Sequence, residues 1–173
     1  MTGELDQTLR RSLTMKVNGR DRTVVVTTRA SLADVLREEV GLTGTHVGCE
    51  QGVCGACTVK VDDAVVRACL VLGVQCQGCD VTTIEGVAPV GELSIEQEAF
   101  WEKHGLQCGF CTPGMIISAQ DLLDRNPDPT EDEVREAMSG NVCRCTGYQF
   151  IVDAVLHAGE LRRAANAHSG DVA

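Results

Sequence analysis

Eight of the ten cysteines of this 173-residue chain fall into two groups of four, and each group is spaced like the ligands of a metal centre. The first group has three cysteines within nine residues and a fourth after eleven more: Cys49, Cys54, Cys57 and Cys69. The second group consists of two separated pairs: Cys108, Cys111, Cys143 and Cys145. A [2Fe–2S] cluster needs four thiolates, and C-x4-C-x2-C followed by a distant cysteine is the plant-type pattern for it. Two such one-electron centres in one small chain predict an electron relay.

The length and the aromatic content indicate small domains that need cross-links. A chain of 173 residues has room for one domain, or for two of about 80 residues each. Domains of that size bury little apolar surface, and metals often staple them. Because the chain has one Trp, one Tyr and three Phe, aromatic burial adds little, and we expect bound clusters to supply the missing cross-links.

The formal net charge of −10 argues against nucleic acid and anionic membranes as partners, because both favour basic patches. The charge suits a partner with a positive rim, although it could equally serve only to keep the protein soluble. No apolar run approaches the roughly 20 residues of a membrane span. The N-terminal 13 residues are polar, and neither a secretory signal nor a twin-arginine leader is expected behind Arg10 and Arg11. We therefore expect a cytoplasmic protein whose cysteines are metal ligands or reduced thiols.

Alternating and β-branched residues in the first half of the chain predict a sheet with one packed helix, which makes an α+β domain. Strands are expected at residues 13–17, 23–28, 58–61, 65–69 and 81–84. The turns between paired strands are expected at Asn18-Gly19 and at Asp62-Asp63. Ser31 is expected to cap a short helix that ends near Gly41.

From residue 94 onward the apolar period becomes helical and predicts a small bundle of four short helices. Three helix starts carry capping signals: Ser94 with Gln97, Thr112 before Pro113, and Thr130 with Glu133. The last helix carries an apolar stripe from Ile151 to Leu161. We therefore expect a flexible arm over residues 1–11, a domain over 12–87, a helical domain over 92–165 and a flexible tail over 166–173.

The first cysteine loop has to curl around one centre. We expect Gly48, Gly52 and Gly55 to adopt positive φ and to turn main-chain N–H groups toward the sulfurs, which raises a cluster's reduction potential. Cys69, on a strand edge, would complete the set. Zinc is the alternative metal, but it prefers two C-x2-C pairs over three cysteines on one loop. A Rieske-type histidine ligand is conceivable at His46, but four cysteines already complete the site, so we expect His46 to form a loop hydrogen bond.

The second group is expected at facing helix starts. Cys108 and Cys111 lead into the helix near Pro113, where free amides and the positive end of the helix dipole favour thiolates. Cys143 and Cys145 are expected on a loop before the last helix, because residues two apart on a helix point in different directions. By residue type alone, this spacing leaves both zinc and an iron–sulfur cluster open.

Three stretches, residues 48–59, 107–115 and 140–148, closely resemble the iron–sulfur subunit of the molybdenum hydroxylases. This is the xanthine oxidase family, in its separate-subunit, carbon monoxide dehydrogenase-like form. The resemblance covers residues 12–160. It implies a β-grasp domain like that of plant-type ferredoxins, followed by a four-helix [2Fe–2S]-binding domain.

The resemblance also implies a place for each cofactor. Cys49, Cys54, Cys57 and Cys69 would hold a cluster toward the flavin subunit, and Cys108, Cys111, Cys143 and Cys145 would hold one beside the molybdopterin. Gln107 and Cys145 match positions that contact the pterin, although Gln107 could instead form a plain hydrogen bond at the helix entry. The chain would be the electron-transfer subunit of an oxidoreductase. It would pass single electrons from the molybdopterin-binding large subunit, through two [2Fe–2S] clusters, to FAD on a medium subunit, in a dimer of heterotrimers. Carbon monoxide, an aldehyde, a purine or an N-heteroaromatic compound would be the substrate.

Two other functions stay open. A soluble ferredoxin could shuttle between enzymes, although a diffusing carrier needs only one cluster. A zinc-stabilised interaction module would lack the iron and acid-labile sulfide, about four of each per chain, that two clusters require. Cys76 and Cys79 form a further C-x2-C that the resembling motifs do not contain. No cysteines remain to complete a third site, so we expect ordinary partly buried thiols, or alternatively oxidation-sensitive ones.

Overall fold

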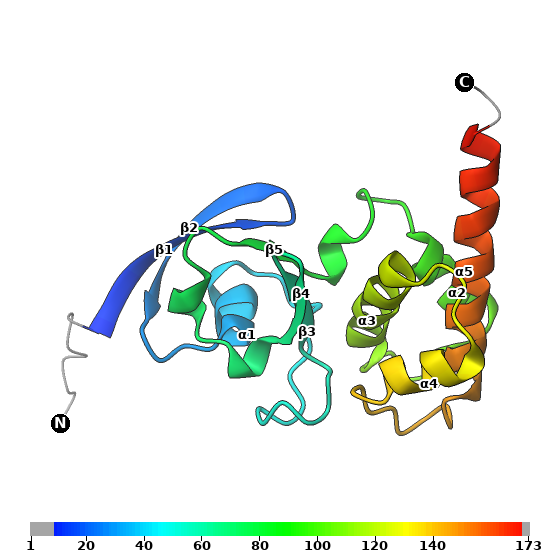
Figure 1. Cartoon of the computed structure of the whole chain (residues 1–173). Coiled ribbons are helices and arrows are strands. Elements are labelled where there is room, and N and C mark those ends of the chain that lie inside the picture. The colour runs from blue at the N-terminus through cyan, green and yellow to red at the C-terminus, as the bar shows by residue number, and fades with distance from the viewer. Residues whose placement is uncertain (1–8, 171–173) are drawn as a thin grey trace.

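The computed structural model describes residues 9–170 (Figure 1). The flexible segments expected over residues 1–11 and 166–173 lie partly outside these residues. Within residues 9–170, the first strand begins at Arg10 and the last helix runs to Gly170, so the strand and the helix extend farther than the apolar pattern indicated. At the N-terminal side the reason is backbone pairing: Arg10 and Arg11 pair with Thr27 and Val26 in the sheet, which needs no apolar side chain.

Five strands form one mixed sheet in the order β2-β1-β5-β3-β4. The strands are β1 (Arg10–Val17), β2 (Arg20–Thr27), β3 (Thr58–Val61), β4 (Ala64–Arg67) and β5 (Asp80–Thr82). β1 and β5 are parallel, and the other neighbours are antiparallel. Both expected turns are confirmed: φ is 51° at Asn18, 75° at Gly19 and 51° at Asp62, the left-handed values that tight hairpin turns require.

One short helix packs on this sheet. It comprises α1 (Leu32–Asp34) and a π-helical turn, η2 (Val35–Glu39). The Ser31 cap is confirmed: its Oγ accepts from the Asp34 amide at 3.1 Å, and Asp34 Oδ2 accepts from the Ser31 amide at 3.1 Å. Leu32 and Leu36 join the alternate residues of β1 in a core that excludes water. This sheet with its helix is the expected α+β, β-grasp arrangement, and that prediction is confirmed.

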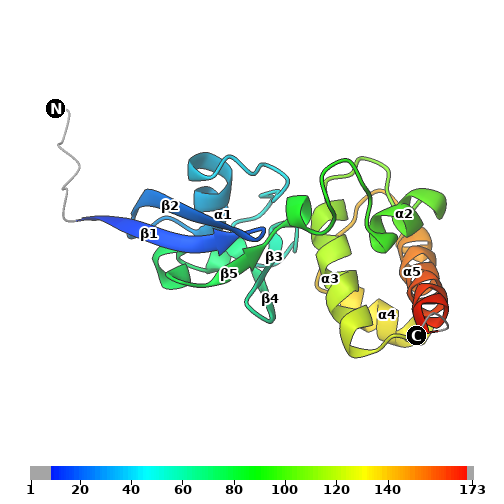
Figure 2. The ribbon, with the colours of Figure 1, turned by 90° about the horizontal axis from the view of Figure 1, so that it is seen from above.

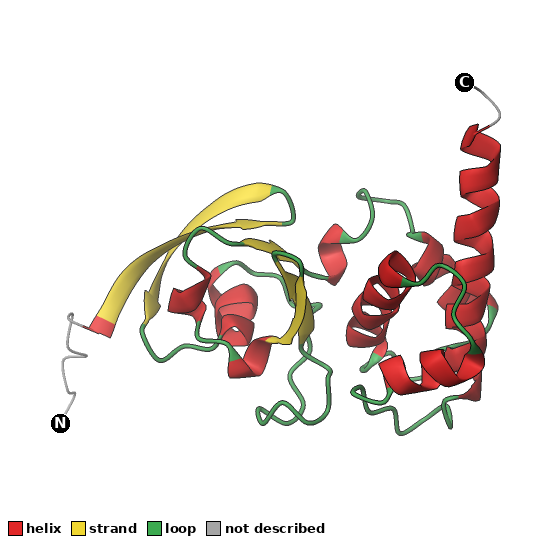
Figure 3. Cartoon of the chain, in the orientation of Figure 1, coloured by secondary structure: helices red, strands yellow, loops and turns green. Residues whose placement is uncertain are grey.

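The second half forms the expected four-helix unit (Figure 3). Its helices are α2 (Ile95–Glu102), α3 (Thr112–Arg125), α4 (Glu131–Met138) and α5 (Gln149–Gly170). The capping boxes at Ser94 and Thr130 are confirmed. The expected Thr112 cap is wrong, because helical hydrogen bonding starts one residue earlier: the Met115 amide donates to the carbonyl of Cys111, which is the N-cap. The hydroxyl oxygen of Thr112 is buried instead.

The two halves have separate apolar cores and lie side by side. The core of the sheet domain collects side chains from β1, β2, β3, β5, α1 and η2, whereas the core of the helical domain collects side chains from α2 to α5. In the view from above, α3 faces β3 and β4 (Figure 2), and α3 contacts both strands. Ile84, in the short turn η5 (Ile84–Gly86), packs against the helical core.

In the described part of the chain, no helix combines the length and apolarity that crossing a membrane requires.

Candidate metal centres

The first quartet begins on a tightly curled loop between α1 and β3. Sγ of Cys49 accepts hydrogen bonds from the backbone amides of Cys54 and Gln51, both at 3.4 Å, and these bonds lower the pKa of Cys49 to about 6. Gly52 and Gly55 have the expected positive φ, 75° and 72°. The loop therefore presents amide hydrogens to a thiolate, as a negatively charged cluster requires.

The expectation of positive φ at Gly48 is wrong, because that residue is needed for space. A Cβ added there would lie 3.3 Å from Cys54 Sγ and 3.3 Å from Cε1 of Phe110. The left-handed turn occurs at Glu50 instead, with φ of 55°. The loop thus approaches both its own cysteine and a residue of the second quartet's loop.

The other two thiols of the first quartet lie deeper. Burial raises the pKa of Cys57 to about 11, and Cys57 also hydrogen-bonds with the Cys69 side chain. Cys69 does not lie on a strand edge as expected, but in the 3-10 turn η3 (Ala68–Leu70). The Ala68 amide still donates to the Cys57 carbonyl at 3.1 Å, and the chain turns directly after this bond. That turn brings the Cys69 side chain to Cys57.

The second quartet divides into an exposed pair and a buried pair. Cys108 and Cys145 are exposed, and their sulfurs lie 3.4 Å apart. The backbone amide of Phe110 lowers the pKa of Cys108, while the hydrogen bond with Cys108 raises the pKa of Cys145. Cys111 is buried at the N-cap of α3, where burial raises its pKa to about 12. Its side chain hydrogen-bonds with Cys143, which is also buried.

A side-chain framework positions the loop that carries Cys143 and Cys145, which is non-helical as predicted. The hydroxyl of Tyr148 accepts from the Cys143 amide at 2.9 Å and donates to the Asn141 carbonyl at 3.3 Å. Oγ1 of Thr146 lies 3.2 Å from Cys143 Sγ. Although burial alone would raise the pKa of Cys143, the hydrogen bonds from Thr146 lower it. This loop therefore stabilises thiolate at the buried position.

The thiols of each quartet associate two by two. A hydrogen bond joins the sulfurs of Cys108 and Cys145, and in the other pairs Cys54 acts on the pKa of Cys49, Cys69 on that of Cys57 and Cys143 on that of Cys111. Within residues 9–170, no group of three or more His, Cys, Asp or Glu side chains is arranged to hold a single metal ion. Paired thiols fit a [2Fe–2S] cluster, because each of its two irons takes two protein ligands.

A buried hydroxyl beside the second quartet supports the same fit. Oγ1 of Thr112, the neighbour of Cys111, is buried and has no hydrogen-bond partner among the described residues. Such a group costs free energy unless it is paired. A cluster sulfur bound beside Cys111 would supply an acceptor.

His46 hydrogen-bonds through Nδ1 to the Phe110 carbonyl at 2.8 Å, so its expected role is confirmed, and Nδ1 carries the proton because a carbonyl only accepts. The side chain of Gln107 is exposed, five residues before α3 begins, so it does not lie at the helix entry.

The two cysteines outside the quartets are less accessible: Cys76 is buried and Cys79 is partly buried. Burial raises the pKa of both thiols, to about 11 for Cys76, so both remain protonated.

Sequence reasoning missed the residues that join the two cysteine loops. Asn141, which is 1% exposed, donates to the Gly55 carbonyl at 3.0 Å, and Arg67 donates to the Gly140 carbonyl at 2.6 Å. Asn141 stands two residues before Cys143 within residues 140–148, and this position is the one sequence signal that points to it. Its partner Gly55 is 86 residues away in the sequence, and no local pattern shows this contact.

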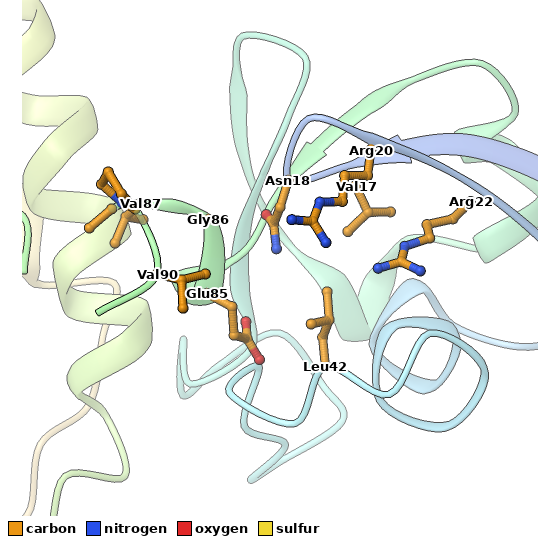
Figure 4. Close-up of a pocket in the computed structure, with 11 residues that line it drawn as sticks. Val17, Asn18, Arg20, Arg22, Leu42, Glu85, Gly86, Val87 and Val90 are labelled. Atoms are coloured by element: carbon orange, nitrogen blue, oxygen red, sulfur yellow. The ribbon is translucent and has the colours of Figure 1, made fainter. Parts of the chain in front are cut away.

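A hollow of about 590 Å³ lies between the β1–β2 hairpin and the segment that follows β5 (Figure 4). Arg20 and Arg22, at the end of the β1–β2 hairpin, line one side, and Glu85, Val87 and Val90 of the connecting segment line another. No cysteine lines it. It is therefore not part of the candidate metal centres.

Comparison with known proteins agrees with this geometry. Residues 83–156 match a family model described as a [2Fe-2S] binding domain. The small subunit of nicotine 6-hydroxylase from Paenarthrobacter nicotinovorans is 57% identical over 144 residues, which are 83% of this chain and 87% of that subunit.

Two solved structures are also similar to this chain. Quinoline 2-oxidoreductase from Pseudomonas putida 86 has a chain that matches with a TM-score of 0.87 and 49% identity, over 90% of this chain and 98% of that one. Aldehyde oxidoreductase from Desulfovibrio gigas matches with a TM-score of 0.84 and 46% identity, over 90% of this chain and 17% of that one.

Proposed function

Because the chain belongs to the small iron–sulfur subunits of the xanthine oxidase family of molybdenum hydroxylases, we propose that it carries electrons between the partner subunits of such an enzyme. The eight paired cysteines would hold two [2Fe–2S] clusters, each of which accepts and releases one electron when bound. The observation that carries the proposal is that both cysteine loops direct polar groups at their sulfurs: backbone amides donate to Cys49, Thr146 lies 3.2 Å from the sulfur of Cys143, and the sulfurs of Cys108 and Cys145 lie 3.4 Å apart.

The chain's own groups prepare both sites for a negatively charged cluster. The amides of Gln51 and Cys54 donate toward Cys49, and Thr146 lowers the pKa of Cys143, so each quartet has a cysteine whose surroundings favour thiolate. Cys57, Cys111 and Cys143 are buried, which excludes water from one side of each site. Hydrogen bonds and burial are the means by which a protein sets cluster potential.

The exposure of Cys108 and Cys145 supports the docking of one partner at this pair. Together with the exposed Gln107, these cysteines would face the molybdopterin of a large subunit, and the first quartet would pass electrons to FAD on a medium subunit. The relative named above is called a small subunit, which supports a multi-subunit complex, and we propose a dimer of heterotrimers. This chain would contribute two domains, residues 12–87 and residues 92–165, each with its own apolar core and its own cluster.

The substrate is decided on another chain. The similar proteins are named for nicotine, quinoline and an aldehyde, so closely related iron–sulfur units occur in enzymes with different substrates. This chain would pass on electrons whatever the large subunit oxidises.

The purified complex tests the proposal. We expect about four irons and four acid-labile sulfides per small subunit, and two distinct S = ½ EPR signals after reduction with dithionite. We also expect the chain to elute with its partners, not alone near 18.5 kDa. A single EPR signal at full spin integration, or zinc in place of iron, would contradict the proposal.

A further inference from the structure

The two cysteine loops meet through a direct backbone hydrogen bond. The amide of Val142, the residue before Cys143, donates to the carbonyl of Cys54 at 2.8 Å. Cys54 belongs to the first quartet and Cys143 to the second. One hydrogen bond and two short backbone segments therefore join a ligand of one centre to a ligand of the other.

A buried amide keeps this contact in place. Nδ2 of Asn141 donates to the Gly55 carbonyl at 3.0 Å, one residue beyond Cys54, and Oδ1 accepts from Ser118 at 3.1 Å. Arg67 donates to Oδ1 at 3.3 Å and to Thr58 Oγ1 at 2.7 Å. Since Asn141 is 1% exposed, leaving its side chain unpaired would cost free energy, and this opposes separation of the loops.

At this contact the two backbones approach each other so closely that a side chain does not fit between them. A Cβ on Gly55 would lie 2.6 Å from the Gly140 carbonyl oxygen, and a Cβ on Gly114 would lie 2.3 Å from the Gly55 carbonyl oxygen. Only glycine permits such approaches. The contact is therefore built into the first cysteine loop on one side, and into α3 and the segment after α4 on the other.

A second contact between the loops offers a longer route. The ring of Phe110 stacks on His46 with centroids 4.8 Å apart, and the Phe110 carbonyl accepts from His46 Nδ1. From His46, however, a path must still run through Val47 and Gly48 to reach Cys49. Electronic coupling falls with each added bond, so the route from Cys143 through Val142 to Cys54 couples the centres more strongly.

We propose, on the basis of the proposed function, that the Val142–Cys54 hydrogen bond is the coupling bridge between the two clusters and that Asn141 is its positioning residue. With both clusters bound, one electron would leave the second cluster through the buried pair Cys111 and Cys143 and would reach the first cluster at Cys54. The second cluster would be oxidised by losing this electron and the first reduced by gaining it, with no bond or proton exchanged. The exposed pair Cys108 and Cys145 remains on the side of the electron donor.

The test compares Val142→Pro with Val142→Ala in the assembled complex. Proline removes the amide hydrogen and alanine keeps it, while both remove the half-exposed valine side chain. Iron content and the two EPR signals first establish that each variant retains both clusters. Rapid-freeze EPR after mixing with substrate then measures how fast reduction passes from the second cluster to the first.

We expect transfer in Val142→Pro to be slower than in Val142→Ala by about tenfold, with the reduced second cluster accumulating, because orientation between redox centres is the protein's contribution. Equal transfer rates in the two variants would overturn the bridge. Failure of the proposed function would give a different result: substrate would then reduce neither cluster of the unmodified complex.

If the Val142→Pro variant does not fold, Asn141→Ala tests the proposed bridge instead. This variant keeps the Val142 amide but removes the side chain that holds the loops together. We expect slower transfer with both clusters present and with unchanged reduction of the second cluster by substrate. A native transfer rate would show that Asn141 does not position the bridge, and a slowed first step would show a general structural defect instead.

Discussion

The two cysteine quartets are built in different ways. The first lies within residues 49–69, and local backbone conformation places its thiols: left-handed turns at Glu50, Gly52 and Gly55 and the 3-10 turn at Cys69. The second comes from two segments separated by α3 and α4, and these segments meet only when the bundle has formed. The first is thus a property of one loop and its flanking strands, whereas the second is a property of a domain.

The difference extends to how thiolate is stabilised. Backbone amides of the same loop hydrogen-bond to Cys49, while side-chain hydroxyls of Tyr148 and Thr146 support Cys143. Backbone donors survive most substitutions, and side-chain donors do not. Single mutations should therefore affect the second cluster more selectively than the first.

The largest effect is expected from loss of a ligand. Cys108→Ser or Cys145→Ser should abolish substrate-driven reduction of the flavin, because the second cluster would be lost from the relay. Iron should fall from about four to about two per chain, with the first cluster's EPR signal retained. Cys76→Ala is the matched control, and it should leave the iron content unchanged. Normal flavin reduction in either serine variant would refute the proposed wiring.

Core truncations test whether the quartets depend on different domains. Ile151→Ala in the helical core and Leu36→Ala in the sheet core each remove a fully buried side chain and should cost about 2–5 kcal/mol of stability. In a urea titration followed by EPR, Ile151→Ala should lose the second cluster's signal earlier than the unmodified protein, and Leu36→Ala the first. If both signals disappear together in both variants, the chain unfolds as one cooperative unit and the comparison fails.

Tyr148→Phe tests the side-chain framework alone. It removes the acceptor of the Cys143 amide without removing the ring, so the net loss should be about 1 kcal/mol. We expect a chelator to extract iron from the second cluster several-fold faster. The first cluster should keep its rate, because among residues 9–170 no side-chain hydroxyl accepts from the amide of a cysteine in its quartet. Equal acceleration at both clusters would show that the framework is not specific to the second.

The smallest effect is expected at Thr112. Thr112→Val keeps the shape of the side chain but removes the buried hydroxyl, so the second cluster should lose one hydrogen bond. Such a bond contributes about 1 kcal/mol, and for a one-electron centre its loss should lower the reduction potential by about 40 mV. Potentiometric EPR titration measures this shift, and Thr112→Ser should restore the native value. A potential that does not move would mean that the hydroxyl does not face the cluster.

Most of the local structure could be predicted from short-range patterns. The turn at Asn18-Gly19, the three capping boxes and the apolar stripe of α5 all depend on residues within a few positions of one another. The errors occurred where a second segment sets the local geometry. Position 48 needs a glycine because a Cβ there would lie 3.3 Å from the ring of Phe110. Cys69 leaves the strand in a 3-10 turn that brings it toward Cys57.

The sequence by itself determined which sulfurs are available, how they are grouped, and that a sheet domain precedes a helical one, because spacing and periodicity are properties of neighbouring residues. Only the tertiary structure decided which thiols pair, which pair is exposed, and that Cys54 meets Val142 across the domains. The physical reason is that buried polar groups must find partners. Asn141 finds its partners on segments far away in the chain, and no one-dimensional pattern records that choice.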